Sequence, residues 1–194
     1  MAIKSQNQPV VAMLTELHVQ WLMFDRAQRR LRTGARHWRL LHRGRDFDRK
    51  FPPGEIMAWA TVCLASFMRV RHMLFEGRRK NPRIVRRCGA LRRLLGNPPL
   101  THVCSPAVRN SWEHLDEHLD TMFDAPKFTS YSHVTIAAAS PENFSFRLFD
   151  PYSLHIQFGP SHVDLKACLA EMRGLSKAID AAFKLLNDGR IVRL

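Results

Sequence analysis

Residues 56–68 form the longest apolar stretch of the chain, interrupted only by Thr61 and Ser66. The stretch is too short to cross a bilayer, which takes about 20 apolar residues. A helix that is apolar nearly all round is buried among other elements. We therefore predict that a helix over Glu55–Glu76 lies at the centre of the fold. A chain of 194 residues is long enough to build one core around it.

Further amphipathic helices are predicted on both sides of this central helix. Apolar residues that recur every three or four positions mark the buried side of a helix. Residues 33–53 are predicted to form a loop, because they contain Gly34, Gly44 and the Pro52-Pro53 pair. The predicted helices span Val10–Leu31, Pro82–Leu95, Ser105 to about Phe123, and Val163–Leu186.

The pattern changes between residues 125 and 162. Ser130–Ala139 is weakly strand-like, and residues 144–149 and 154–158 alternate apolar and polar side chains around a turn. Such alternation on both sides of a turn predicts a β-hairpin. We expect a mainly α (α+β) fold: a bundle of about five helices with a small β-hairpin or sheet before the last helix. The predicted single domain, 1–194, comprises a helical bundle (10–123), a β-containing insertion (125–162) and a C-terminal helix (163–187).

Positive charge is concentrated in the first half of the chain. Residues 1–100 contain 21 Lys and Arg against 6 Asp and Glu, whereas residues 101–194 contain 9 against 11. Clustered arginines gain affinity for a polyanion by releasing counterions from its phosphates. This asymmetry predicts a polyanionic partner such as RNA, and a solvated basic face without a ligand is the alternative. The arginines predicted to contact RNA lie on the third helix: Arg83, Arg86, Arg87, Arg92 and Arg93.

The cysteines and the N-terminal residues indicate a reducing compartment. The four cysteines are spaced like neither a zinc site nor a disulfide framework. Cys63 and Cys168 fall on apolar helical faces, which predicts reduced core thiols. Met1–Leu14 lacks the apolar segment of a signal peptide. We expect a cytoplasmic protein with no membrane partner and no cofactor.

Residues 108–120 combine an apolar side with a dense set of ionisable groups. On a helix, five apolar residues, of which the last lies just beyond this segment, share one arc that would face the core: Val108, Trp112, Leu115, Leu119 and Met122. The opposite face is polar: Arg109, Asn110, Glu113, His114, Asp116, Glu117, His118 and Asp120. Residues four apart lie next to each other on a helix, so Glu113 can pair with Arg109. By the same spacing, Asn110 can orient His114.

The string Arg109-Asn110-x-x-x-His114 resembles the Arg-x4-His signature of HEPN domains, a helical superfamily of RNases and nucleotide binders. The surrounding string resembles uncharacterised bacterial HEPN-like proteins. The resemblance implies a metal-independent endoribonuclease whose dimer pools the Arg and His of both subunits. His114 would act as general base or acid, and Arg109 would stabilise the charged transition state. Asn110, Glu113 and Asp116 would support these two residues, and the product would carry a 2′,3′-cyclic phosphate.

Three functions follow from these features. The first, which we favour, is a HEPN-like endoribonuclease, a homodimeric toxin or defence effector controlled by an antitoxin or regulator protein. The second is a non-catalytic helical module that binds nucleic acid or a partner protein, which the carboxylates crowded around the motif favour. The third is a metal-dependent hydrolase with His114, His118 and His102 as ligands, although their order differs from that of zinc proteases. The favoured function needs no metal.

Overall fold

The computed structural model of this chain describes residues 7–45, 51–75, 81–106, 135–136, 147–158, 161–189 and 192. This part of the chain is mainly helical, with a small sheet before the last helix, so the predicted fold class is confirmed. The described residues contain four helices; the helix predicted over residues 105–123 lies almost entirely outside them. The elements are α1 (Gln8–Leu41), α2 (Pro53–Leu74), α3 (Pro82–Leu94), β1 (Thr135–Ile136), β2 (Arg147–Asp150), β3 (His155–Phe158), β4 (Ser161–Asp164) and α6 (Leu165–Asn187).

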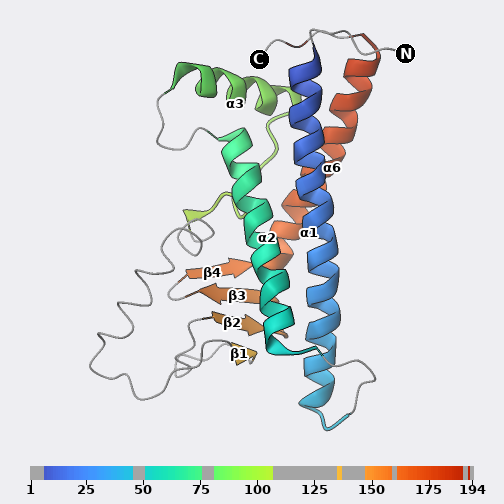
Figure 1. Cartoon of the computed structure of the whole chain (residues 1–194), viewed down its shortest axis with the longest axis vertical. Helices are drawn as coiled ribbons and strands as arrows, with labels where there is room; N and C mark the ends of the chain where they lie inside the picture. Colours follow the sequence, from blue (N-terminus) through green and yellow to red (C-terminus); the bar gives the residue numbers. More distant parts are fainter. Residues whose placement is uncertain are drawn as a thin grey trace, which may run out of the picture.

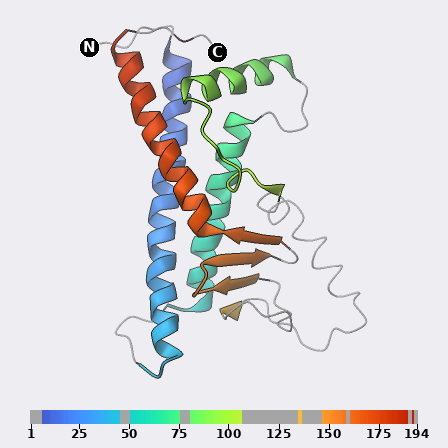
Figure 2. The ribbon, with the colours of Figure 1, turned by 180° about the vertical axis from the view of Figure 1, so that it is seen from behind.

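Helix α2 lies at the centre of the packing, as predicted from its apolar sequence. It runs antiparallel to α1 and also contacts α3 and strand β2 (Figure 1). Helix α6 packs against α1 and crosses the α1–α2 pair from behind (Figure 2). The rings of Phe24 and Phe67, both fully buried, lie 5.1 Å apart between α1 and α2. Buried residues of α1, α2, α6 and the sheet form one continuous core.

Helix α1 continues ten residues beyond its predicted end, so the loop predicted over 33–53 is wrong for residues 33–41. The reason is close packing at Gly34. A Cβ atom at this position would lie 2.5 Å from Cδ1 of Ile56 on α2, so glycine lets the two helices approach. Trp38, one turn later, donates its indole N–H to the carbonyl oxygen of Phe51 at 3.0 Å. These contacts hold the extra turns of α1 in place although the local sequence favours a break.

This packing predicts a strong coupling between Gly34 and Ile56. Alanine is favoured over glycine in a helix by about 1 kcal/mol, but overpacking a core costs about 1–3 kcal/mol. Gly34→Ala alone is therefore expected to destabilise the protein by about 1 kcal/mol. In an Ile56→Val background, which lacks Cδ1, the same change is expected to stabilise it by up to about 1 kcal/mol. Urea unfolding of the four proteins measures the coupling, and additive effects would contradict the close packing.

The four strands form one sheet in the order β1-β2-β3-β4, with β1 parallel to β2 and the other pairs antiparallel. The predicted hairpin is β2–β3, and β1 lies within the weakly predicted strand. One row of apolar residues crosses all four strands and is buried in the common core: Ile136, Phe149, Ile156 and Val163. The alternation read from the sequence therefore places one face of the sheet against the helices.

The last helix begins at Leu165, two residues later than predicted. Residues 161–164 instead pair with β3 as a fourth strand, which the sequence pattern does not predict. Asp164 ends that strand and caps α6: its Oδ1 accepts the backbone N–H groups of Lys166 (2.8 Å) and Ala167 (3.1 Å). A carboxylate at this position satisfies two of the unpaired amides in the first turn of a helix.

The helix cap makes stability depend on the charge of Asp164. Burial is the largest single influence and raises the pKa of this carboxyl, but the groups around it together lower the pKa below its usual value, led by the backbone amides of Ala167 and Lys166. The charges of His155 and His102 lower the pKa further. Because the pKa is lower in the folded state, the stabilisation is present above about pH 4 and is lost as the pH falls through the folded pKa.

We therefore expect Asp164→Ala to destabilise the protein by about 1 kcal/mol at pH 7. The difference from the unchanged protein should shrink when the pH is lowered to about 3. Asp164→Asn is the control, since an amide oxygen still caps the helix but does not titrate. Urea unfolding at the two pH values measures both changes. Equal losses for the Ala and Asn variants would show that the capping hydrogen bonds contribute nothing.

Candidate nucleic-acid interface

The residues of the expected catalytic site lie outside the described part of the chain: Arg109, Asn110, Glu113, His114, Asp116 and also His118. His102, the third metal ligand considered, is described, and its backbone N–H donates to the Glu171 carboxylate at 2.9 Å. Within the described ranges, no group of three His, Cys, Asp or Glu side chains could hold a metal ion. The structure therefore bears on the basic surfaces that were predicted to bind RNA.

Helix α3 presents three of its five candidate RNA-binding arginines to solvent. Asn81 begins the helix by accepting the backbone N–H of Arg83 at 3.0 Å. Arg83, Arg86 and Arg93 are exposed, and residues 81–106 contain no acidic side chain. Arg86 and Arg93 lie two turns apart on the same side of the helix. These three side chains can reach a phosphate backbone without breaking an ion pair of their own helix.

The other two candidates, Arg87 and Arg92, are half-buried and are held differently. The guanidinium of Arg92 lies over the ring of Phe75, 4.7 Å from its centroid. Arg87 lines a groove between α1 and α2. The Nε atoms of both are buried and have no hydrogen-bond partner among the described residues. Their positions favour Arg83, Arg86 and Arg93 as the phosphate contacts of α3.

The C-terminal half of α1 carries a second basic surface. The sequence pattern does not predict this surface, because it favours a loop over residues 33–53. Arginines recur there at intervals of three and four residues, which places them along one side of the helix over about 15 Å. We call this set the arginine ridge: Arg29, Arg32, Arg36 and Arg39. Arg32 and Arg36 are exposed and have no ion-pair partner within the described residues. The arginine spacing was visible in the sequence, but its meaning depends on the segment being helical.

The surroundings of the arginine ridge are strongly positive. Residues 26–45 contain eight arginines and no acidic residue. Asp25 pairs with Arg29, and Arg39 donates from Nε to the carbonyl oxygen of Ala35 at 3.3 Å. A shallow hollow of about 410 Å³ adjoins the ridge, and its described lining comes from α1: Leu22, Asp25, Arg26, Arg29, Arg30 and Thr33. An extended polyanion can therefore lie along the ridge with few repulsive contacts.

The arginine ridge and the arginines of α3 lie toward opposite ends of α1 (Figure 1). The first turns of α1, up to Glu16, border the groove that contains Arg87 of α3. The 13 residues from Glu16 to Arg29 correspond to about 20 Å of helix. The basic first half of the sequence thus folds into two separate positive surfaces, and the ridge is the one with the regular spacing.

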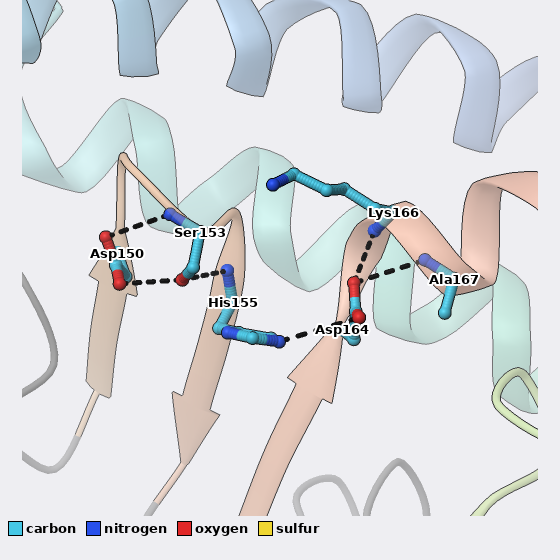
Figure 3. A network of polar contacts seen from close by, with 6 residues as sticks. All are labelled: Asp150, Ser153, His155, Asp164, Lys166 and Ala167. Carbon is cyan, nitrogen blue, oxygen red and sulfur yellow. Dashed lines mark hydrogen bonds and ion pairs between the residues drawn. The ribbon is translucent and has the colours of Figure 1, made fainter.

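A serine, a histidine and two aspartates lie close together beside the sheet, but their geometry does not make a nucleophile (Figure 3). The hydroxyl of Ser153 donates to Oδ2 of Asp150 at 2.6 Å, and Oδ1 of Asp150 accepts the backbone N–H of Tyr152 at 2.7 Å. The His155 imidazole lies 3.6 Å from Asp164, and only the backbone N–H of His155 reaches Ser153. These contacts stabilise the β2–β3 turn and the start of α6.

Three of the four cysteines are poorly suited to form a reactive thiolate. All four are free, and Cys63, Cys88 and Cys168 are buried, which confirms the prediction of core thiols at Cys63 and Cys168. Burial raises the pKa of Cys63 and Cys168. Burial also raises the pKa of Cys104 to about 12, although Arg71 and Arg92 lie nearby. A thiol must ionise to act as a nucleophile, so none of these three is suited to that role.

Two further observations concern membrane-spanning helices and similarity to known proteins. Among the described residues, no helix combines the length and the apolar character that crossing a membrane requires. No protein family, no curated protein and no solved structure matches the chain.

Proposed function

We propose that this chain binds RNA, and that the arginine ridge of α1 is its main contact with the phosphate backbone. The observation that carries the proposal is a row of four arginines on one side of α1: Arg29, Arg32, Arg36 and Arg39. After Asp25, no acidic residue follows in this helix. Arg83, Arg86 and Arg93 of α3 form a second, separate contact surface. The two surfaces together suit an RNA that is long enough to reach both.

The type of cation supports a phosphate ligand. Residues 1–100 contain 18 arginines and 3 lysines. The planar guanidinium of arginine binds a phosphate through two parallel hydrogen bonds and also stacks on bases, whereas lysine offers a single point charge. Arginine residues three or four apart on a helix are spaced about 5 Å along its axis. Several neighbouring phosphates of one strand can therefore be contacted at the same time.

The proposal is tested by the salt dependence of RNA binding. A labelled single-stranded RNA of about 20 nucleotides is titrated with protein at several salt concentrations. Each neutralised phosphate of a single strand contributes about −0.7 to the slope of log K against log salt. Four ridge contacts therefore predict a slope of about −2.8 or steeper. A flat salt dependence, or tighter binding to anionic lipid vesicles than to RNA, would contradict the proposal.

A more specific form of the proposal is that the chain cleaves the RNA that it binds. Its support is the HEPN-like string Arg109-Asn110-x-x-x-His114, with Glu113 inside the string and Asp116 two residues after it. In this proposal the chain acts as a cytoplasmic homodimer, restrained by an antitoxin or regulator protein. The ribose 2′-OH of the RNA attacks the adjacent phosphorus, the bond from phosphorus to the 5′-oxygen breaks, and the 5′-oxygen leaves with a proton. His114 moves the proton and Arg109 stabilises the negative charge on the phosphate. The ridge would hold the RNA strand.

Cleavage of labelled RNA in excess chelator tests this form of the proposal. Products that end in a 2′,3′-cyclic phosphate are expected, because the 2′-OH, and not water, is the nucleophile in the first step. Salt-dependent binding without cleavage would instead support the non-catalytic module that binds nucleic acid. Cleavage that chelator abolishes would point to a metal-dependent hydrolase.

A further inference from the structure

A groove of about 610 Å³ lies where the start of α1 meets the end of α2 and the middle of α3. Its lining combines apolar and charged side chains: Pro9, Ala12, Met13, Glu16, Arg69, His72, Met73 and Arg87. Met13 and Met73 are partly buried and pack against the hydrophobic core. Methionine side chains adapt their shape to different ligands, and they are common in grooves that bind helices.

Among the charged residues that line the groove, Glu16 and Arg69 pair with each other, whereas Arg87 lacks an acceptor for its Nε among the described residues. Glu16 is already paired, since its Oε1 accepts from Nε of Arg69 at 3.2 Å and from the Gln20 amide at 3.0 Å. Arg87 has a buried Nε with no hydrogen-bond partner among the described residues. His72 is exposed beside it. Arg87 as a whole is half-buried at the groove, so an acidic side chain that enters the groove can pair with its guanidinium away from bulk water, where such a pair is stronger.

We infer that the groove binds an amphipathic helix of a partner protein, with acidic residues that contact Arg87 and apolar residues that contact Met13 and Met73. The groove is lined by α1 and α2 and by Arg87 of α3, and it is not enclosed, which suits a helix laid into it better than a small enclosed ligand. Its basic side chains outnumber its one carboxylate and select an acidic partner, and Met13 and Met73 require an apolar face. This inference goes beyond the proposed RNA binding and does not rest on it.

The groove is separate from the arginine ridge. About 20 Å of α1 lies between Glu16 at the groove and Arg29 at the start of the ridge. A partner helix in the groove would leave the ridge accessible to RNA. The two binding activities can therefore be altered independently by substitutions.

The probe is a labelled peptide of about 18 residues that carries Leu on one helical face and Glu on the other, and binding is followed by fluorescence anisotropy. One control peptide has Ser in place of Leu, and a second has Lys in place of Glu. We expect the Leu/Glu peptide to bind at least about tenfold more tightly than either control, because each control lacks one of the two matching features. A Ser/Glu peptide that binds equally well would mean that charge alone is responsible and would overturn the inference.

Two single substitutions locate the peptide. Arg87→Gln removes the charge without shortening the side chain much, and Ala12→Glu adds a negative charge at an exposed position of the lining. Each is expected to weaken the Leu/Glu peptide at least about tenfold. Arg32→Gln changes the net charge as Arg87→Gln does, but on the ridge, and should weaken RNA binding instead.

Three outcomes would overturn the inference. Equal loss of peptide affinity in Arg32→Gln and Arg87→Gln would show non-specific attraction to a basic protein. Competition between RNA and the peptide would assign the groove to the RNA interface. Conversion of a dimer to a monomer by Ala12→Glu, measured by sedimentation, would identify a second copy of this chain as the occupant. Circular dichroism confirms that each variant is folded before the affinities are compared.

Discussion

Replacing Arg32 and Arg36 together by glutamate is expected to lower the affinity for RNA about a hundredfold at 0.1 M salt. Both side chains are exposed on the arginine ridge and have no ion-pair partner within the described residues, so their charge is available to a ligand. The double change removes two phosphate contacts and adds two repulsive charges. A hundredfold loss corresponds to about 2.7 kcal/mol, or little more than 1 kcal/mol per side chain. The slope of log K against log salt should become less steep by about 1.4.

The matched control moves the same charge change to another helix. Arg173 and Lys177 are exposed on α6 and lie outside both basic surfaces. Arg173→Glu with Lys177→Glu alters the net charge by the same amount, so long-range electrostatics are affected similarly. We expect a loss of at most a few-fold and an unchanged salt slope. If the ridge and control variants bind RNA equally weakly, the ridge is not a specific contact surface.

The helices that could be predicted are those whose ends and faces are set by local residues. The predicted start of α3 follows from Pro82, and its end follows from Gly96, which has a φ of +72°. The central position of α2 follows from its apolar composition, because a helix without a polar side can be stable only when it is surrounded. In these cases the local sequence and the tertiary packing favour the same structure.

Where the prediction failed, distant contacts outweighed the local sequence. Gly34 usually indicates a break, but here it gives Ile56 of α2 the space to pack against α1. Strand β4 was missed because four residues that pair with β3 carry no pattern long enough to identify. Val163 is compatible with a strand and with a helix. It is buried in β4, and at the start of α6 it would have extended the apolar face of that helix. No property of these short segments taken alone separates the two possibilities.

The incorrect loop prediction over residues 33–41 also affected the candidate site. While residues 33–41 were predicted to be a loop, Arg36 and Arg39 had no fixed relation to Arg29 and Arg32. Once the helix continues through Gly34, the four arginines lie on one side. Conversely, α3 was correctly predicted as a helix, but which of its arginines turn inward depends on Phe75 and on the groove beside α1. The sequence predicts that charge is present, whereas the packing decides where it can be used.

Replacing His114 by alanine is expected to reduce RNA cleavage by a factor of about 10² to 10⁴, which is the usual contribution of a general acid or base. The HEPN-like string motivates this second test, because an imidazole with a pKa of about 6.5 can accept and donate protons near neutral pH. His118→Ala is the matched control, because the same residue type is removed four positions further along the sequence. It should cleave RNA at nearly the original rate.

Binding separates a catalytic role of His114 from a structural one. If His114 only transfers protons, His114→Ala should keep the RNA affinity and the salt slope of the unchanged protein, because the ridge arginines are intact. Arg32→Glu with Arg36→Glu should show the reverse pattern, in which cleavage falls at low protein concentration and recovers when the protein is raised above the weakened Kd. If the unchanged protein and His114→Ala both cleave RNA no faster than a mock purification, the nuclease proposal fails and RNA binding remains as the function. Equal cleavage by both proteins above that background would exclude His114 as the general acid or base.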